Sequence, residues 1–246
     1  MKAKEDSLFT LHCLPGFLGQ SRDWDSILPM RINRYCYDFF SHRGTPPSFD
    51  LFDLGEWINT RAAGMPNPRV LMGYSFGGRV ALHALIQNSK LWTAGIIVSA
   101  HLGLQNSMER QSRRLSDLAW AERFLKDDWG SLRDDWNSQP LFRFASVQAE
   151  KCEFEYSRFA LSHALQAGSL ANQKDLRAEL SLLELPLLWI SGEQDARFEK
   201  LMREAVALNP RFQGRCVSGA GHRVPWDQSD AFRQILFDFL QSLVGI

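Results

Sequence analysis

The amino-acid sequence predicts an α/β fold, in which a mostly parallel, doubly wound sheet carries an inserted helical cap. Three observations favour this fold class. Short apolar runs alternate with stretches of helical periodicity along most of the chain. Most of these runs are continuously apolar, which is typical of parallel strands covered on both faces. One long interval between two runs contains no strand-like segment, and the 246 residues suit one globular core with such an insertion.

The apolar runs and the helical stretches define the elements in order. Six strands are predicted, over Ser7–Leu14, Arg34–Asp38, Arg69–Met72, Ala94–Ser99, Leu187–Ser191 and Gly214–Ser218. Helices are predicted over Leu51–Ala63, Gly78–Asn88, Phe198–Leu208 and Asp227–Val244. Strands that alternate with helices indicate crossover connections, and therefore neighbouring strands that run parallel.

The alternation stops between Ser99 and Leu185. Two helix-like stretches occupy this interval, Ser107–Lys126 and Glu153–Ala171. An insertion at the carboxyl edge of a sheet leaves the core intact and covers the edge where ligands bind. We therefore expect an α/β core formed by residues 1–103 and 182–246, and a cap segment formed by residues 104–181.

The composition excludes several classes of function. The chain has 28 Lys and Arg and 28 Asp and Glu, so no net charge favours a nucleic acid or a membrane surface as partner. No apolar run marks a secretory signal or approaches the length of a membrane span. The four cysteines lack the spacing of metal ligands, so we expect a cytoplasmic protein with no metal site. Composition does not indicate an oligomeric state.

The strongest motif is Gly-x-Ser-x-Gly, formed by Gly73, Ser75 and Gly77. It follows a predicted strand directly and precedes a predicted helix. A nucleophile elbow requires this context, because the serine is held in a strained turn while small neighbours avoid clashes with the strand and the helix. A chance match to so short a pattern is common, but the strand–turn–helix context favours a nucleophilic serine.

Two downstream residues complete a catalytic arrangement in the order Ser, Asp, His. Asp195 and His222 each follow a predicted strand, where loops at the carboxyl edge form ligand sites. His222 would accept the Ser75 proton, and Asp195 would orient the imidazole and stabilise its charged form. A lone loop Asp or His is more often a solvated surface group, so the prediction depends on the order and placement of all three.

Other groups at this edge complete the expected site. An oxyanion hole needs two backbone N–H groups, and we expect them from Phe76, after the serine, and from Phe17, after the first strand. His42 and His101 also follow strands at this edge, so each is a candidate for the pocket wall.

Longer segments carry a resemblance to a known family. The chain resembles the α/β-hydrolase superfamily and, within it, the 2-succinyl-6-hydroxy-2,4-cyclohexadiene-1-carboxylate synthase (MenH) family. One segment is Gly73–Arg79, with its Tyr before the Ser and its Arg four residues after it. The other continuous segments are Ser99–Asn106, Asp135–Phe142, Gly192–Phe198 and Gly219–His222. Between the first two of these, a spaced series also matches: Arg110, Arg113, Ser116, Asp117, Trp120 and Arg123–Leu125. The resemblance covers the cap segment too. Because cap sequences diverge readily, a match there is more specific evidence than the triad motifs.

The resemblance implies a lyase with an α/β-hydrolase fold and no cofactor. Its substrate would be a cyclohexene that bears a succinyl arm, a ring carboxylate and an enolpyruvyl ether. Ser75, relayed by His222, would remove a ring proton next to the succinyl ketone, and pyruvate would leave by elimination without an acyl-enzyme. The oxyanion hole would stabilise the charge that develops on the ketone oxygen.

The resemblance also implies the substrate-binding residues. Arg79, Arg113 and Arg158 align with the family's substrate arginines, although Arg158 is offset by one residue, and Tyr74 and Trp136 carry over as pocket residues. Arginines suit a small anionic substrate, because a guanidinium binds a carboxylate through two parallel hydrogen bonds. Without the resemblance, an arginine on a helix is as often part of a solvated face as it is a ligand-binding residue.

One departure from the family concerns the first loop. The family usually has His-Gly-Phe there, whereas this chain has Pro15-Gly16-Phe17. Proline cannot supply the hydrogen bonds of the histidine side chain, so the support of this loop has to come from elsewhere.

Two other functions remain open from the sequence. A serine hydrolase, either a carboxylesterase or a carbon–carbon bond hydrolase, would use the same triad with an acyl-enzyme, and the arginine-rich cap segment argues against it. A ligand-binding receptor that only retains the triad is the non-enzymatic alternative. The complete set of Ser75, Asp195 and His222 argues against that reading.

Overall fold

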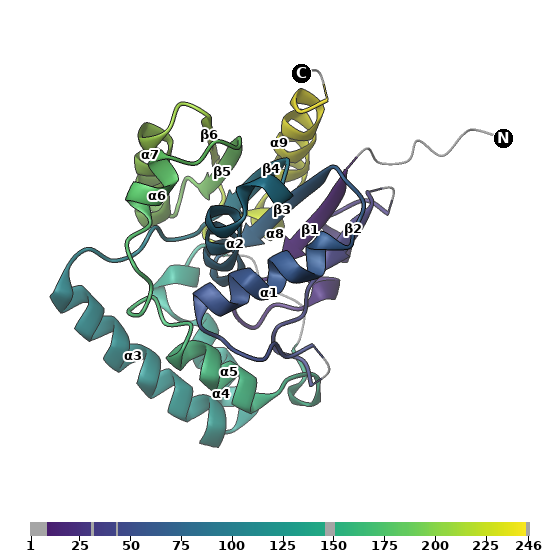
Figure 1. Cartoon of the computed structure of the whole chain (residues 1–246). Coiled ribbons are helices and arrows are strands. Elements are labelled where there is room, and N and C mark those ends of the chain that lie inside the picture. The colour runs from purple at the N-terminus through teal and green to yellow at the C-terminus, as the bar shows by residue number, and fades with distance from the viewer. Residues whose placement is uncertain (1–8, 31, 43, 146–150, 245–246) are drawn as a thin grey trace.

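The computed structural model describes residues 9–30, 32–42, 44–145 and 151–244. Its centre is a six-stranded sheet in the order β2-β1-β3-β4-β5-β6, and every neighbouring pair is parallel (Figure 1). The strands are β1 Thr10–Leu14, β2 Arg34–Cys36, β3 Arg69–Tyr74, β4 Ala94–Val98, β5 Leu187–Gly192 and β6 Phe212–Val217. The predicted sheet is therefore confirmed. The first two residues of its first predicted strand, at positions 7 and 8, lie outside the described residues.

Side chains alternate between two apolar layers on the faces of the sheet. In β3, Leu71 belongs to the layer with helices α1 (Leu51–Ala63), α2 (Phe76–Gln87) and α7 (Ala196–Leu208). Its neighbours Val70 and Met72 belong to the layer with α9 (Ser229–Ser242), which follows the short α8 (Val224–Asp227). All three side chains are fully buried, as expected for strands that helices cover on both faces.

Among the described residues, four helices lie between β4 and β5 in the chain. They are α3 Ser107–Lys126, α4 Trp129–Asn137, α5 Arg158–Gln166 and α6 Arg177–Ser181. Three of them, α3, α4 and α5, lie together in the lower part of Figure 1, whereas α6 lies beside α7. Short 3-10 turns cover Ser21–Ser26, Ser89–Leu91, Pro140–Phe142 and Glu153–Glu155. The bounds of the cap segment, residues 104 and 181, remain a prediction.

Two predicted helices differ from the structure. The stretch Glu153–Ala171 was expected as one helix, but α5 begins only after Ser157, whose hydroxyl accepts the Ala160 N–H at 3.2 Å as a helix cap. The stretch Asp227–Val244 is divided into α8 and α9, because Gln228 has φ −138° and ψ 64° and so leaves the helical region.

Two possible features are not found in the described ranges. No helix there has the length and apolar character that crossing a membrane requires. No group of three or more His, Cys, Asp or Glu side chains there is placed to hold a metal ion.

Buried histidines lie within the core. His12, in β1, is fully buried, and its Nδ1 lies 3.0 Å from the Tyr37 hydroxyl. Burial, together with the charge of Arg69, lowers the pKa of His12 to about 4. Burial likewise lowers the pKa of His83, in α2, to about 4. Both imidazoles are therefore neutral in the native protein at neutral pH.

We predict that acid destabilises the protein through these histidines. Between about pH 6.5, the ordinary histidine pKa, and pH 4, the unfolded chain binds protons that the native His12 and His83 do not. The free energy of unfolding should therefore fall as pH falls through this window, by at most ~1.4 kcal/mol per pH unit for each histidine. Urea unfolding at pH 7, 6 and 5 measures this slope.

The variant His12→Asn is the matched test, because an Asn oxygen can replace Nδ1 as the partner of Tyr37. Its unfolding free energy should depend less steeply on pH than that of the wild type. If the dependence of the unfolding free energy on pH is the same in the variant and the wild type, the pKa of His12 does not differ between the native and the unfolded state.

Candidate active site

Ser75 occupies a strained turn between β3 and α2. Its φ is +51° and its ψ is −108°, a conformation that non-glycine residues rarely adopt. Its N–H donates to the Val98 carbonyl at 2.8 Å, which fixes the turn against β4. A Cβ on Gly73 would overlap the Gly77 carbonyl, so the strand and the helix approach each other only because these positions are glycine. The turn therefore has the form of a nucleophile elbow.

The three residues predicted as a triad lie in one hydrogen-bonded chain. The Ser75 hydroxyl lies 3.0 Å from His222 Nε2, and His222 Nδ1 lies 2.7 Å from Asp195 Oδ2. His222 is only 1% exposed. With Nδ1–H donating to the carboxylate, Nε2 is left as the acceptor of the serine proton. The arrangement can thus transfer a proton away from Ser75.

Helix and loop contacts hold the acid and the base in place. Asp195 caps α7, because its Oδ1 accepts the Phe198 N–H at 3.4 Å while its other oxygen accepts from His222. The loop that carries His222 is fixed in turn, since the Gly221 N–H donates to Asp227 Oδ2 at 2.9 Å. Both side chains are therefore oriented by backbone groups of the α/β core.

Aromatic rings surround the imidazole. The ring centroids of Phe198, Tyr74 and Phe142 lie 4.6, 5.7 and 5.9 Å from that of His222. These rings keep water from the imidazole. In such surroundings the attraction between a protonated His222 and Asp195 is stronger than it would be in water.

Two backbone N–H groups beside Ser75 are available to an oxyanion. Among the described residues, neither the Phe17 nor the Phe76 amide has a hydrogen-bond acceptor. The first loop packs directly on the elbow, because a Cβ on Gly16 would lie 3.6 Å from that of Ser75. Both expected residues also line the same cavity as the serine. The arrangement is that of a two-amide oxyanion hole.

The first loop is supported without the histidine that the related family has there. Within the loop, the Gly19 N–H donates to the Gly16 carbonyl at 2.9 Å. From the cap segment, the Tyr156 hydroxyl donates to the Leu18 carbonyl at 2.9 Å, and this tyrosine is 2% exposed. Tyr156 thus supplies a hydrogen bond to a loop that Pro15 cannot support through its own side chain.

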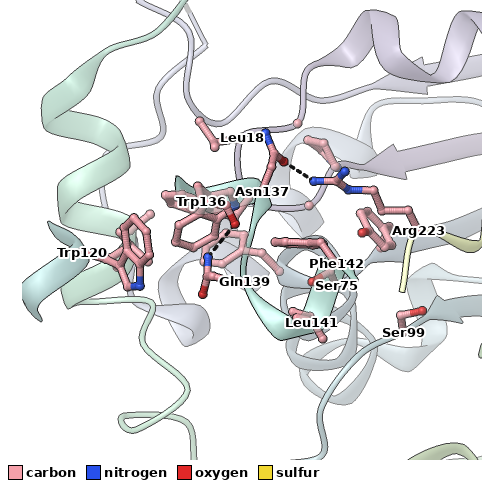
Figure 2. Close-up of a pocket in the computed structure, with 18 of the residues that line it drawn as sticks. Leu18, Ser75, Ser99, Trp120, Trp136, Asn137, Gln139, Leu141, Phe142 and Arg223 are labelled. Carbon is pink, nitrogen blue, oxygen red and sulfur yellow. Dashed lines mark hydrogen bonds between the residues drawn. The ribbon is translucent and has the colours of Figure 1, made fainter. Parts of the chain in front are cut away.

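A cavity of about 780 Å³ opens over Ser75, between the α/β core and the cap segment (Figure 2). His101 lies in its wall, and burial together with nearby arginines lowers the pKa of His101 to about 3. His42 is not among the lining residues. Of the other predicted site residues, Ser75, Phe17, Phe76, Tyr74, Arg79, Arg113 and Trp136 line it.

Arg79 is a buried cation in the wall of this cavity. It is 8% exposed and donates to the Gly168 carbonyl at 2.9 Å and to Gln173 Oε1 at 3.4 Å. No carboxylate of the described chain lies within ion-pair distance of it. Burial, followed by the charge of Arg113, lowers the pKa of Arg79 to about 9, so it remains charged at neutral pH. A buried guanidinium without a carboxylate favours an anionic ligand.

Arg113 lies in the same wall but already has a carboxylate partner. Its Nε contacts both oxygens of Asp117, at 2.9 and 2.8 Å, and Asp117 also accepts from the Ser169 hydroxyl at 2.6 Å. These contacts use one nitrogen of the guanidinium. The terminal nitrogens remain as donors for a ligand.

Arg158 is placed elsewhere, which corrects the expectation for it. It does not line the cavity. Its guanidinium forms an ion pair with Glu153 at 2.6 Å and donates to the carbonyls of Phe124 and Asp127 at 3.2 and 2.8 Å. As the first residue of α5, it is committed to contacts between helices of the cap segment. Arg158 is therefore not placed to bind a ligand in this cavity.

The two predicted aromatic residues shape the wall. Trp136 packs on Phe17 and Trp120, with ring centroids 4.7 and 5.0 Å apart. Tyr74 is 6% exposed, and burial raises the pKa of its hydroxyl, so the phenol stays protonated at neutral pH. Both rings line the cavity.

Several lining residues were not predicted from the sequence. They include Ser99, Asn137, Phe142, Lys151 and Arg223. A signal existed for Arg223, because it directly follows the predicted base. Asn137 and Phe142 belong to a segment that carried the family resemblance, but no residue type there identified a role.

Comparison with known proteins gives consistent matches over most of the chain. Residues 10–235 match the model of the Alpha/beta hydrolase family. The chain is 32% identical over 244 residues to the 2-succinyl-6-hydroxy-2,4-cyclohexadiene-1-carboxylate synthase of Salmonella agona (strain SL483), covering 94% of this chain and 93% of that protein. The protein of the same name from Salmonella schwarzengrund (strain CVM19633) is 31% identical with the same coverage.

Solved structures share the fold. MenH from S. aureus matches with a TM-score of 0.84 and 25% identity, over 99% of this chain and 97% of that one. A thermophilic esterase from Thermogutta terrifontis matches with a TM-score of 0.73 over 96% of this chain and 91% of that one. At 17% identity, the esterase shows only a common fold.

We predict that Ser75 reacts with a fluorophosphonate probe in a manner that depends on His222. Ser75→Ala should abolish labelling, and His222→Asn should slow it by about 100-fold or more, because the hydroxyl then lacks its proton acceptor. Labelling is followed over time by intact-mass spectrometry.

Ser99 supplies the matched control. It lines the same cavity, but its buried Oγ has no hydrogen-bond partner among the described residues. Ser99→Ala should leave labelling unchanged. Equal labelling of wild type and Ser75→Ala would rule out an activated Ser75.

Proposed function

The chain belongs to the alpha/beta hydrolase family and, within it, to the MenH family of 2-succinyl-6-hydroxy-2,4-cyclohexadiene-1-carboxylate synthases, and from this we propose its reaction. It eliminates pyruvate from 2-succinyl-5-enolpyruvyl-6-hydroxy-3-cyclohexene-1-carboxylate. The product is 2-succinyl-6-hydroxy-2,4-cyclohexadiene-1-carboxylate, an intermediate of menaquinone (vitamin K2) biosynthesis. The observation that carries this proposal is the buried Arg79, one helical turn from a serine with a proton relay. Arg79 has no carboxylate partner among the residues that the structure describes.

The substrate's charge fits the cavity wall. The substrate bears three carboxylates, and Arg79 and Arg113 present guanidinium groups on one side of the cavity. A charge-assisted contact to a carboxylate is favourable there, because Arg79 is largely removed from water before the ligand arrives. A neutral ester would gain nothing from these groups.

The relay performs the proton transfer. As His222 accepts the Ser75 proton, the serine oxygen removes the ring proton next to the succinyl ketone. The electron pair moves through the ring double bond and breaks the bond to the enolpyruvyl oxygen. The leaving enolate takes a proton on carbon to become pyruvate, which restores the proton balance. Asp195 stabilises the charged imidazole during the transfer.

The amides of Phe17 and Phe76 stabilise the intermediate charge. Negative charge develops on the succinyl ketone oxygen when the neighbouring proton leaves. Two N–H groups directed at that oxygen lower the barrier, since they are already fixed in the loop and at the helix terminus. The reaction as proposed uses no metal and no cofactor.

A serine hydrolase is the second candidate function. The distance of 3.0 Å from Ser75 to His222 would equally serve attack on an ester or on a carbon–carbon bond next to a ketone. The two reactions differ in one respect: the hydrolase forms a covalent acyl-enzyme on Ser75, and the lyase does not.

We predict turnover that depends on the triad but involves no covalent intermediate. Ser75→Ala, Asp195→Asn and His222→Ala should each lower pyruvate release by about 10²–10⁴-fold or more, because the three act as a unit. Deuterium at the abstracted ring position should slow the wild type if proton removal limits the rate.

Mass spectrometry during turnover separates the two functions. Only unmodified protein should be present throughout. A substrate-derived adduct on Ser75 that forms and decays at the rate of turnover would contradict the lyase mechanism and favour the hydrolase.

We predict that Arg79 and Arg113 contribute to substrate capture. Arg79→Ala and Arg113→Ala should each lower kcat/KM for the anionic substrate about 10- to 150-fold, the effect of one charge-assisted contact of about 1.5–3 kcal/mol. Pyruvate release is measured at low substrate concentration.

The neighbouring arginine gives the control. Arg114 lies next to Arg113 on α3 but is exposed and does not line the cavity, so Arg114→Ala should keep native kinetics. If Arg79→Ala and Arg113→Ala lower kcat/KM for a small neutral ester as much as for the anionic substrate, the two arginines have a structural role only.

A further inference from the structure

Arg223 places another guanidinium in the wall of the cavity. It directly follows His222 and is 6% exposed. Its guanidinium lies 4.3 Å from the ring centroid of Phe142 and donates to Asn137 Oδ1 at the end of α4 (Figure 2). It also interacts with the Tyr74 hydroxyl, next to the serine. The side chain thus extends from the loop of the catalytic base to the cap segment.

The surroundings of Arg223 suit an anionic ligand. Two of its side-chain partners, Asn137 and Tyr74, are uncharged, and the negative charge of Asp227 lies near it. Burial removes water that would otherwise stabilise the guanidinium, and it lowers the pKa of Arg223. A carboxylate in the cavity would restore part of that stabilisation.

The cationic groups reach the cavity from different sides. Arg79 is held by Gly168, which follows α5, whereas Arg223 is held by Asn137, at the end of α4. Ser75 is flanked by residues that relate to both groups: Tyr74, which interacts with Arg223, directly precedes it, and Arg79 follows it by one helical turn. A ligand centred over the serine could therefore place one carboxylate toward each guanidinium.

We propose that Arg223 is a specificity-determining residue that binds one carboxylate of the substrate, while Asn137 orients its guanidinium. The proposal rests on the proposed function, since it assigns a partner to one of the three carboxylates of that substrate. Arg223 takes the place that the sequence assigned to Arg158, whose guanidinium is committed to the cap segment.

A purely structural role makes a different prediction. If Arg223 served only to connect the core to the cap segment through Asn137, removing either partner would have the same effect. If it binds substrate, removing the guanidinium has a large effect, and removing Asn137 alone has a small one, because the charge remains in the wall.

The test measures binding and turnover with the full-length protein. Two probes are titrated calorimetrically: 2-succinylbenzoate, which keeps the ring carboxylate and the succinyl arm, and 3-benzoylpropionate, which lacks the ring carboxylate. Arg223→Gln should weaken binding of 2-succinylbenzoate about 10- to 150-fold and raise KM for pyruvate release. Arg223→Lys should restore part of the affinity, because it keeps the charge but not the fork of donors.

Arg215→Gln is the control, because Arg215 is exposed on β6 and lies outside the cavity, and it should bind within about threefold of wild type. Asn137→Ala should lose clearly less affinity than Arg223→Gln, because it removes the orienting contact but leaves the charge. A loss confined to 2-succinylbenzoate assigns Arg223 to the ring carboxylate, and a loss on both probes assigns it to the succinyl carboxylate. Thermal unfolding of each variant verifies that it is folded.

The outcomes separate this inference from the proposed function. If wild type binds the probes and releases pyruvate but Arg223→Gln matches it, or if Arg223→Gln and Asn137→Ala lose affinity equally, Arg223 is not a substrate ligand. If wild type neither binds the probes nor releases pyruvate, the proposed function is overturned, and this inference with it.

Discussion

The strained backbone of Ser75 is the constraint on which the site depends. A residue with φ +51° persists only where its neighbours leave no alternative, and here β4 holds its N–H while glycines allow strand, helix and loop to meet. The same turn starts α2 with the Phe76 amide free of an acceptor in the described chain. One conformation thus positions the Ser75 hydroxyl, the Phe76 amide and, one helical turn later, Arg79.

Sequence reasoning located the α/β core because local patterns determine it. The apolar runs, the Gly73–Gly77 motif and the order of Asp195 and His222 follow from short-range rules of strand, turn and helix. The parallel pairing follows from the crossover connections between successive strands, whereas the strand order was not predicted from the sequence. The structure brings Ser75, Asp195 and His222 within hydrogen-bond distance, which the sequence could only suggest.

The cap segment was less predictable, because its contacts are tertiary. Arg158 and Arg223 are both arginines near recognisable motifs, and only three-dimensional packing decides which one faces the cavity. The role of Tyr156 could not be inferred either, since its hydroxyl supports a loop 138 positions away in the sequence. Contacts of this kind join the cap segment to the core around the cavity, so the shape of the cavity belongs to both.

Asp195 joins two functions that are usually separate. Its carboxylate both begins a helix and orients the His222 imidazole, one oxygen for each. Fraying of the first turn of α7 would therefore release the imidazole at the same moment, and a well-oriented imidazole would in turn oppose fraying. The free energy of opening the first turn of α7 therefore sets a lower limit on the fraction of molecules in which the His222 imidazole is not oriented. A mutation that changes the stability of this helix end would change that fraction as well.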